Sequence, residues 1–146
     1  MHKYLPIFAI LLAIIAAVES CPCEPPPPEA ELQCKKKYLI LVRIQYENID
    51  LINNQRIYGF HKIHDLEHPF PLGPSFLEIH TPIDPDHCGF VFELGHDYLI
   101  AGDYFNNHLV LSTCNSYVQK WLLPPTSEES IIELEKIKKN CASIHA

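Results

Sequence analysis

The stretch KKKYLILVRIQYENI, residues 35–49, decides the fold that we expect for this chain. Its apolar residues are mainly leucine, β-branched or aromatic, and these types suit a pleated, buried surface, so the stretch predicts a strand. Residues 48–54 supply turn chemistry. Two further strands are predicted at residues 56–64 and 76–81, separated by the proline-rich segment 68–74.

The remaining chain predicts two more strands, at residues 97–101 and 108–113, with a polar turn over residues 102–107 between them. After Pro124 and Pro125 the spacing of apolar residues changes to that of a helix. The residues that indicate this helix are the caps Thr126 or Ser127, the acidic first-turn residues Glu128 and Glu129, the apolar stripe Ile131, Ile132, Leu134 and Ile137, and the basic end Lys136, Lys138 and Lys139. Five strands and a late helix favour an all-β-dominated fold, a five-stranded closed barrel of the oligonucleotide/oligosaccharide-binding (OB) type with a C-terminal helix.

Residues 24–31 contain four consecutive prolines, which fix φ and remove backbone donors. We expect this segment to be extended and polyproline-like, and neither a helix nor a central strand.

Residues 1–20 have the pattern of a cleavable export signal, with Lys3 ahead of an apolar run and Ser20 at the cleavage position. The apolar run is shorter than the roughly 20 residues of a membrane span. We therefore predict a secreted, extracellular protein whose single mature domain is residues 21–146. The alternative is a lipoprotein signal that attaches lipid to Cys21, although Glu19 is an unfavourable neighbour for that processing.

The composition excludes some classes of partner. The formal net charge is −7, and the signal contributes nothing to it, because Lys3 and Glu19 cancel. Nucleic acid and anionic membranes both require a basic face, so neither is an expected partner. The six cysteines of an exported chain indicate three disulfides, and counting alone leaves fifteen possible pairings.

Several motifs resemble those of a netrin-like domain, and more narrowly the inhibitory amino-terminal domain of the tissue inhibitors of metalloproteinases. The matching residues are Cys21-Pro22-Cys23, Cys34, Cys88-Gly89-Phe90, Tyr98-Leu99-Ile100-Ala101-Gly102, Thr113-Cys114, Tyr117-Val118-Gln119-Lys120-Trp121 and Cys141. The resemblance covers the whole mature chain. It implies the disulfides Cys21–Cys88, Cys23–Cys114 and Cys34–Cys141.

The resemblance also implies a function. A secreted inhibitor of zinc metalloproteinases would present an exposed surface, here called the terminal ridge, made of Cys21, Pro22, Cys23, Glu24 and Pro25 beside Asp86, His87 and Cys88. The free α-amine and the carbonyl of Cys21 would chelate the catalytic zinc of the target enzyme. Such a protein is not an enzyme, has no cofactor of its own, acts as a monomer, and has extracellular zinc metalloproteinases as partners.

One residue departs from the family pattern. Members of the family usually carry a small hydroxylated side chain after the first cysteine, and this chain has Pro22 there. Proline lacks a backbone N–H, so it would fill the specificity pocket of the enzyme differently. We expect selectivity to depend on Pro22 and on the loop at residues 48–55.

Two other functions are open to the sequence. The first is a netrin-like extracellular binding module that uses its surface to recognise a receptor or matrix component without inhibiting a protease. The second is a zinc hydrolase, because His64, Glu67 and His68 match the H-x-x-E-H pattern, which requires a helix. Residues before His64 alternate as in a strand and Pro69 follows, so we expect an exposed loop instead.

Other conspicuous residues have simpler interpretations. The nine histidines are scattered without ligand spacing, which favours solvated surface positions. Tyr98 to Ala101 is best explained as a buried strand, and Trp121 with Tyr117 as a cap on the core. The basic run at residues 35–37 is expected to protect a sheet edge, with a patch for sulfated matrix sugars as the alternative.

Overall fold

The computed structural model describes residues 21, 23, 28–66 and 78–145. The predicted export signal at residues 1–20 lies outside the described residues, as do Pro22, Glu24 and Pro25. In chain order the described elements are α2 (Glu29–Cys34), β1 (Tyr38–Asp50), β2 (Gln55–Asp65), β3 (Glu78–Pro82), the 3-10 helix η1 (Pro85–His87), β4 (Asp97–Phe105), β5 (His108–Val110), β6 (Tyr117–Trp121) and α3 (Glu128–His145). None of the helices within these residues is both long enough and apolar enough to cross a bilayer.

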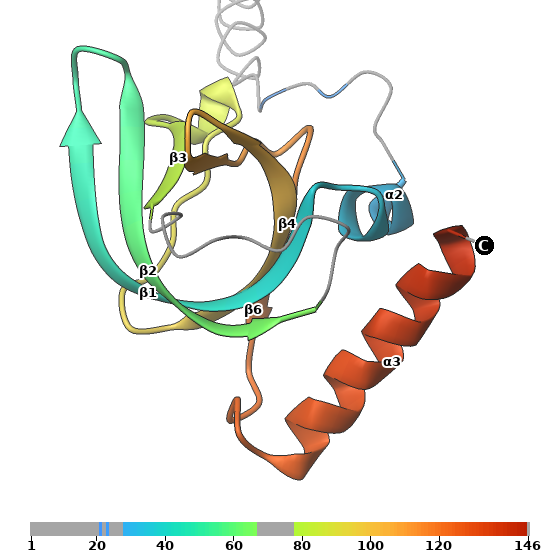
Figure 1. Ribbon diagram of the computed structural model, residues 1–146. Helices are drawn as coiled ribbons and strands as arrows, with labels where there is room; N and C mark the ends of the chain where they lie inside the picture. Colours follow the sequence, from blue (N-terminus) through green and yellow to red (C-terminus); the bar gives the residue numbers. More distant parts are fainter. Residues whose placement is uncertain (1–20, 22, 24–27, 67–77, 146) are drawn as a thin grey trace, which may run out of the picture.

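The strands form a mixed sheet that curves into a ring (Figure 1). Its order is β1-β2-β3-β5-β4, and the pairing of β1 with β4 returns the sheet to its first strand. Strand β6 pairs with β4 and lies next to the ring. All described pairings are antiparallel except that of β3 with β5. The prediction of a sheet-dominated fold with a C-terminal helix is confirmed.

The first part of strand β1, from Tyr38 to Val42, is buried on both faces, which explains its continuous apolar run. Tyr38, Ile40 and Val42 belong to one core cluster, together with Tyr58 and Ile100 from neighbouring strands. The intervening residues Leu39 and Leu41 belong to a second cluster that includes Leu134, Ile137 and Trp121. Side chains alternate across a strand, so the first cluster fills the ring and the second lies under α3. Register shifts at Leu41/Val42 and Ile44/Tyr46 help β1 to bend, as bulges do.

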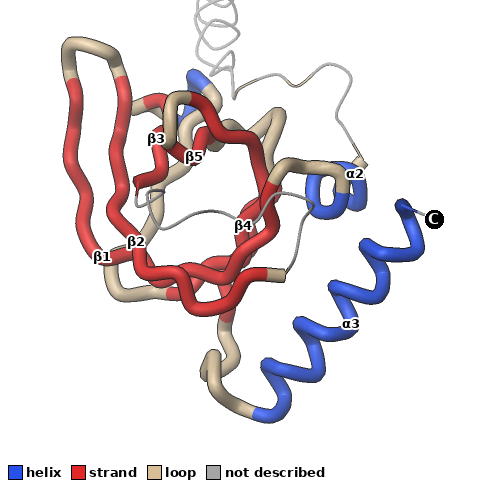
Figure 2. The backbone as a smooth tube through the Cα atoms, viewed as in Figure 1, coloured by secondary structure: helices blue, strands red, loops and turns tan. Residues whose placement is uncertain are grey.

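Helix α3 runs along the outside of the ring (Figure 2). Its predicted cap is confirmed, because the Ser130 backbone N–H donates to Ser127 Oγ at 3.2 Å. The apolar stripe is only half buried: Leu134 and Ile137 face the second core cluster, whereas Ile131 and Ile132 are 49% and 60% exposed. The helix also continues to His145, so the three lysines lie in its middle and the prediction of a basic end is wrong.

The region from β4 to β6 differs from the prediction in two respects. Residues 102–105 were predicted as turn, but they continue β4, because Asp103 to Phe105 pair with β5 and only Asn106 and Asn107 form the turn. Both asparagines have positive φ, as a tight hairpin of this kind requires. The sequence did not predict β6 as a strand.

The extended conformation predicted for residues 24–31 is wrong at its end. Helix α2 begins at Glu29, directly after Pro28. Proline is unfavourable inside a helix, but its fixed φ is compatible with a position at the start of one. A helix can therefore begin directly after the last proline of the run.

Three disulfides cross-link the fold, and their pairings confirm those implied by the resemblance. They are Cys21–Cys88, Cys23–Cys114 and Cys34–Cys141, with Cα–Cα distances of 5.1, 5.2 and 4.9 Å. These distances are typical of disulfides. The first two bind the start of the described chain to the segments around Cys88 and Cys114, and the third attaches α2 to α3.

Candidate functional site

The two disulfides of the terminal ridge are in contact. The sulfur of Cys114 lies 3.5 Å from that of Cys21 and 3.7 Å from that of Cys88. Cys21 and Cys23 are both half-buried. The residues at either side of Pro22 are therefore held by one compact group of sulfur atoms. Pro22, Glu24 and Pro25, the other predicted residues on this side of the ridge, are outside the described residues.

The opposite side of the ridge is the short helix η1 and the cysteine that follows it. The backbone N–H of Cys88 donates to Pro85 O at 3.1 Å, and that of Gly89 donates to Asp84 O at 3.0 Å. Cys88 itself is left-handed, with φ of 70°. This conformation turns the chain back sharply, so Cys88 faces the start of the chain while Asp86 and His87 remain exposed.

Gly89 allows a close backbone approach behind the ridge. A Cβ atom at this position would lie 2.1 Å from Pro82 O and 2.8 Å from Asp84 O. Both oxygens belong to the backbone and cannot move aside easily, so no larger residue fits without displacing the loop. The loop is also tied to its neighbours, since Phe90 N–H donates to Thr81 Oγ1 at 2.9 Å and Thr113 N–H to Cys88 O at 3.0 Å.

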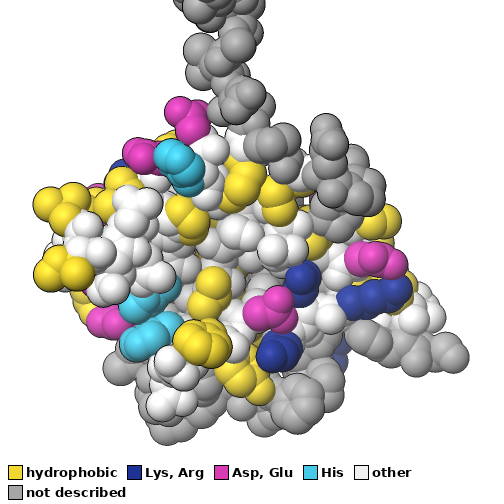
Figure 3. All heavy atoms as spheres, turned by 90° about the horizontal axis from the view of Figure 1, so that it is seen from above, with side chains coloured by type: hydrophobic (Ala, Val, Ile, Leu, Met, Phe, Trp, Pro, Cys, Tyr) yellow, Lys and Arg dark blue, Asp and Glu magenta, His cyan; other side chains and the backbone are white. Residues whose placement is uncertain are grey.

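The hairpin that joins β1 to β2 exposes apolar side chains. Leu51 and Ile52, at its tip, are 81% and 95% exposed. Asp50 orders the tip, because its carboxylate accepts hydrogen bonds from the backbone of Ile52 and Asn53 at 3.0 and 3.1 Å. Figure 3 shows apolar side chains at the edge of the molecule to which this hairpin extends. The predicted selectivity loop at residues 48–55 is thus an ordered projection with an apolar end.

The structure brings together a group of residues that the sequence did not indicate. Glu78 and His80 on β3 meet His108 at the start of β5. A carboxylate oxygen of Glu78 and one ring nitrogen of each histidine lie within 4.8 Å of one another. We call these three residues the seam cluster. The expectation that the histidines are scattered is therefore wrong for His80 and His108. The spacing Glu78-x-His80 in a strand was the available signal, because such residues share a face.

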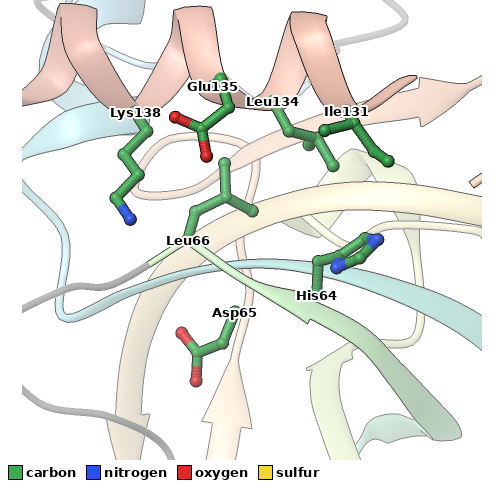
Figure 4. A pocket seen from close by; sticks show the side chains of 7 residues that line it. All are labelled: His64, Asp65, Leu66, Ile131, Leu134, Glu135 and Lys138. Carbon is green, nitrogen blue, oxygen red and sulfur yellow. The ribbon is translucent and has the colours of Figure 1, made fainter. Parts of the chain in front are cut away.

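The H-x-x-E-H pattern does not form a helix at its first residue. His64 lies on β2, and its Nε2 is 3.3 Å from Pro125 O. Glu67 and His68 lie outside the described residues. His64 lines a pocket of about 250 Å³ between the end of β2 and α3 (Figure 4), with apolar residues in its wall and Asp65, Glu135 and Lys138 around it. Leu66 and Leu134, which line the pocket, also belong to the second core cluster. The pocket is therefore a gap at the junction of the helix with the sheet.

Two simpler predictions are confirmed by burial. Tyr98 to Ala101 lie on β4 and are buried. Trp121 is buried in the cluster under α3, and its Nε1–H donates to Ser130 Oγ at 2.9 Å.

The basic run at residues 35–37 is largely compensated. Lys35 Nζ lies 2.8 Å from Glu31, Lys36 Nζ lies 3.6 Å from Asp103, and Lys37 Nζ is 4.9 Å from the centre of the Tyr104 ring. Each of these lysines thus has an acidic or aromatic neighbour that interacts with its charge. This favours protection of a sheet edge over an anion-binding patch.

The residues of the terminal ridge that the structure describes are thus joined by disulfides and fixed by backbone hydrogen bonds, whereas the seam cluster is a separate group on β3 and β5. No protein-family model matches the chain.

Proposed function

We propose that this protein is a secreted inhibitor of zinc metalloproteinases, with a netrin-like domain similar to the inhibitory domain of the tissue inhibitors of metalloproteinases. The observation that carries the proposal is the pairing of Cys21 with Cys88 and of Cys23 with Cys114. Among fifteen possible pairings, the set in the structure is the one that the resemblance implies. The proposed export signal is compatible with these disulfides, which persist in oxidising compartments.

We assign the ring of strands to the OB class. The order β1-β2-β3-β5-β4, in which β3 runs parallel to β5 and β1 returns to β4, supports a five-stranded Greek-key barrel. The core cluster of alternate residues from these strands supports the same assignment, because the interior of a small barrel is filled by side chains.

Inhibition would occur at the metal of the target enzyme. A catalytic zinc has three protein ligands and one position open to water. After removal of the signal, the α-amine of Cys21 and its carbonyl oxygen would occupy that position and form a five-membered chelate ring. An α-amino group has a pKa of about 8, so loss of its proton costs little near neutral pH. The enzyme would then lack the water that it activates for hydrolysis.

The disulfides give this mechanism its affinity. A flexible terminus would lose conformational freedom on binding, and that loss would oppose association. Here Cys21 is bonded to Cys88, whose loop is fixed by hydrogen bonds to Pro85, Asp84 and Thr113. The ordering has taken place during folding, so the free energy of metal coordination is available for binding.

Selectivity would depend on the residues around the terminus. Pro22 would fill the specificity pocket of the enzyme without a backbone N–H. The exposed apolar tip at Leu51 and Ile52 offers a second contact surface, since side chains of this kind gain most from burial against a partner. Enzymes with a shallow apolar pocket and a complementary apolar rim are the expected targets.

The test is an amino-terminal extension. The full chain is expressed in a secreting host, the amino terminus is verified by mass, and inhibition is titrated against several zinc metalloproteinases. A second form carries one additional alanine ahead of Cys21, which removes the α-amine from its position and leaves every other residue unchanged. The native form should inhibit at one molecule per enzyme, and the extended form should be at least 100-fold weaker. Equal inhibition by both forms would exclude chelation by Cys21.

A Pro22→Thr variant provides the matched control for shape. It keeps the α-amine and restores a hydroxylated side chain with a backbone N–H, so it should retain the stoichiometry and change the ranking of the enzymes. If neither this variant nor the native form inhibits any enzyme, the alternative of a netrin-like binding module for a receptor or matrix component is favoured. In that case binding through the surface should survive the additional alanine.

A further inference from the structure

We propose that the seam cluster, Glu78, His80 and His108, binds a divalent transition-metal ion of the zinc class and thereby holds β3 and β5 together. This site lies on strands that do not include Cys21, and it does not depend on the inhibitory function proposed above.

The three side chains converge at the line where β3 meets β5. Glu78 and His80 are two positions apart on β3 and share a face of the strand, and His108 is the first residue of β5. The two imidazole rings stack, with centroids 4.1 Å apart and planes inclined by 23°, so His108 would have to rotate out of the stack to direct a ring nitrogen at the same ion as His80.

The distances fit a small metal ion. Glu78 Oε2 lies 3.4 Å from His80 Nε2 and 3.7 Å from His108 Nδ1. Two ligand atoms on a tetrahedral zinc, with bonds of about 2.0–2.2 Å, are roughly 3.3–3.6 Å apart. The distance between the two nitrogens is within 4.8 Å and would shorten by a rotation of His108, whose side chain is 41% exposed. Two imidazoles and a carboxylate suit zinc, copper or nickel better than magnesium or calcium.

Gln55 orients one of the ligands. His80 Nδ1 is 2.9 Å from Gln55 Oε1, and an amide oxygen only accepts hydrogen bonds, so Nδ1 carries a proton. In the neutral ring the lone pair is then on Nε2, which faces the Glu78 carboxylate. Two acceptors that face each other are stabilised by a cation between them, which can be a metal ion or a proton. A histidine that donates its second ring N–H to a fixed oxygen is the usual arrangement around protein-bound metals.

A metal at this position would strengthen the shortest described pairing of the ring. Strands β3 and β5 are paired only at Ile79↔Leu109 and His80↔Val110. Bonds from β3 and β5 to one ion would cross-link them, and the binding free energy would add to the stability of the folded ring. A pocket of about 380 Å³ lies beside the cluster, lined in part by Asn53, Gln55 and Phe105, and has room for a water as the fourth ligand.

The test is a zinc titration of the secreted protein, produced without a polyhistidine tag and freed of metal by a chelator. Calorimetry with zinc chloride should give one ion per chain. His80→Gln and His108→Gln should each weaken binding by roughly 100-fold or more, and Gln55→Ala by about 10- to 100-fold, since it removes only an orienting group. The matched control is His96→Gln, which removes a histidine from another surface pair, at 3.2 Å from Glu93, and should bind as the wild type does.

Two further measurements keep the result independent of variant folding. In NMR spectra of the wild-type protein, zinc should shift the ring signals of His80 and His108 and leave those of His96 unchanged. Zinc should also raise the melting temperature of the wild type and of His96→Gln, but not that of His108→Gln. The form with an additional alanine ahead of Cys21 should bind zinc normally. Wild-type binding no tighter than that of a His80→Gln/His108→Gln double variant, or unshifted ring signals, would overturn the proposal and leave a proton as the bridging cation.

Discussion

At the scale of single residues, two buried tyrosines of the same core differ in whether their hydroxyl groups have hydrogen-bond partners. Tyr38 and Tyr58 are both fully buried. The Tyr58 hydroxyl accepts from Phe92 N–H and donates to Glu47, each at 3.1 Å, whereas the Tyr38 hydroxyl has no hydrogen-bond partner within the described part of the chain. Burial also raises the pKa of Tyr38 well above its usual value, so the hydroxyl remains neutral.

The same substitution at these two tyrosines should have opposite effects. Tyr38→Phe removes an unsatisfied hydroxyl and should raise the free energy of unfolding by about 1 kcal/mol. Tyr58→Phe leaves the Phe92 N–H without its acceptor and should lower it by about 1–3 kcal/mol. Urea denaturation of the two variants measures both values. Equal destabilisation by both would mean that Tyr38 has a partner in solution.

Asp50 makes the hairpin tip dependent on pH. The side-chain bond from Asn53 is the main reason why the pKa of Asp50 is lowered from its usual value, and backbone bonds from Asn53 and Ile52 contribute. A lowered folded pKa means that this contribution to stability is fully present above the unfolded pKa of about 3.9 and is lost as pH falls through the folded pKa. The wild type should therefore exceed Asp50→Asn in unfolding free energy at pH 6 but not at pH 2. A difference that is the same at both pH values would contradict this role.

At the scale of elements, α3 packs against the sheet through a buried polar contact and the apolar residues of one helix face. Ser130 is fully buried and accepts from the Trp121 indole on β6, while Leu134 and Ile137 pack against the second core cluster. Ser127 caps the amino-terminal end of the helix by accepting a hydrogen bond from Ser130 N–H. The position of the helix thus depends on β6, a strand that the sequence did not predict.

Substitution of the two serines should separate these contributions. Ser130→Ala leaves the indole N–H buried without an acceptor and should cost about 1–3 kcal/mol of unfolding free energy. Ser127→Ala removes a cap and should cost about 0.5–2 kcal/mol. Ser143→Ala, at an exposed position of the same helix, is the control and should change little. Chemical denaturation followed by Trp121 fluorescence reports all three, and an inert Ser130→Ala would show that the helix is held by apolar packing alone.

At the scale of the whole molecule, the three disulfides join distant parts of the chain, with sequence separations of 67, 91 and 107 residues. Two of them fix the terminal ridge, and the third attaches α2 to α3. All three bridges therefore stabilise the fold, whereas the proposed inhibition depends on the first two.

A variant with Cys34→Ala and Cys141→Ala should separate the two properties. Opening a loop of this length should lower the unfolding free energy by up to about 5 kcal/mol. The bridges of Cys21 and Cys23 remain, so inhibition of a sensitive enzyme at low temperature should be nearly unchanged. The measurements are thermal unfolding and an inhibition titration of the same sample. If inhibition were lost while the ring remained folded, the terminal ridge would depend on α3.

The sequence by itself determined several of the local elements of this fold. The sequence predicted the apolar run of β1, the cap at Ser127 and the buried strand at Tyr98 to Ala101. These features depend on the conformational preference and the hydrophobicity of residues that are neighbours in the sequence. The disulfide pairing came from the resemblance of the motifs, since six cysteines by themselves leave the choice open.

Only the tertiary structure decided the rest. The polar residues Asp103 and Tyr104 form a strand because a neighbouring strand satisfies their backbone. Glu78, His80 and His108 meet because the ring brings β3 beside β5, although the first and last are 30 residues apart in the chain. Local sequence fixes the conformation that a segment prefers, whereas long-range strand pairing fixes its neighbours, and a site made by neighbours appears only when the ring has formed.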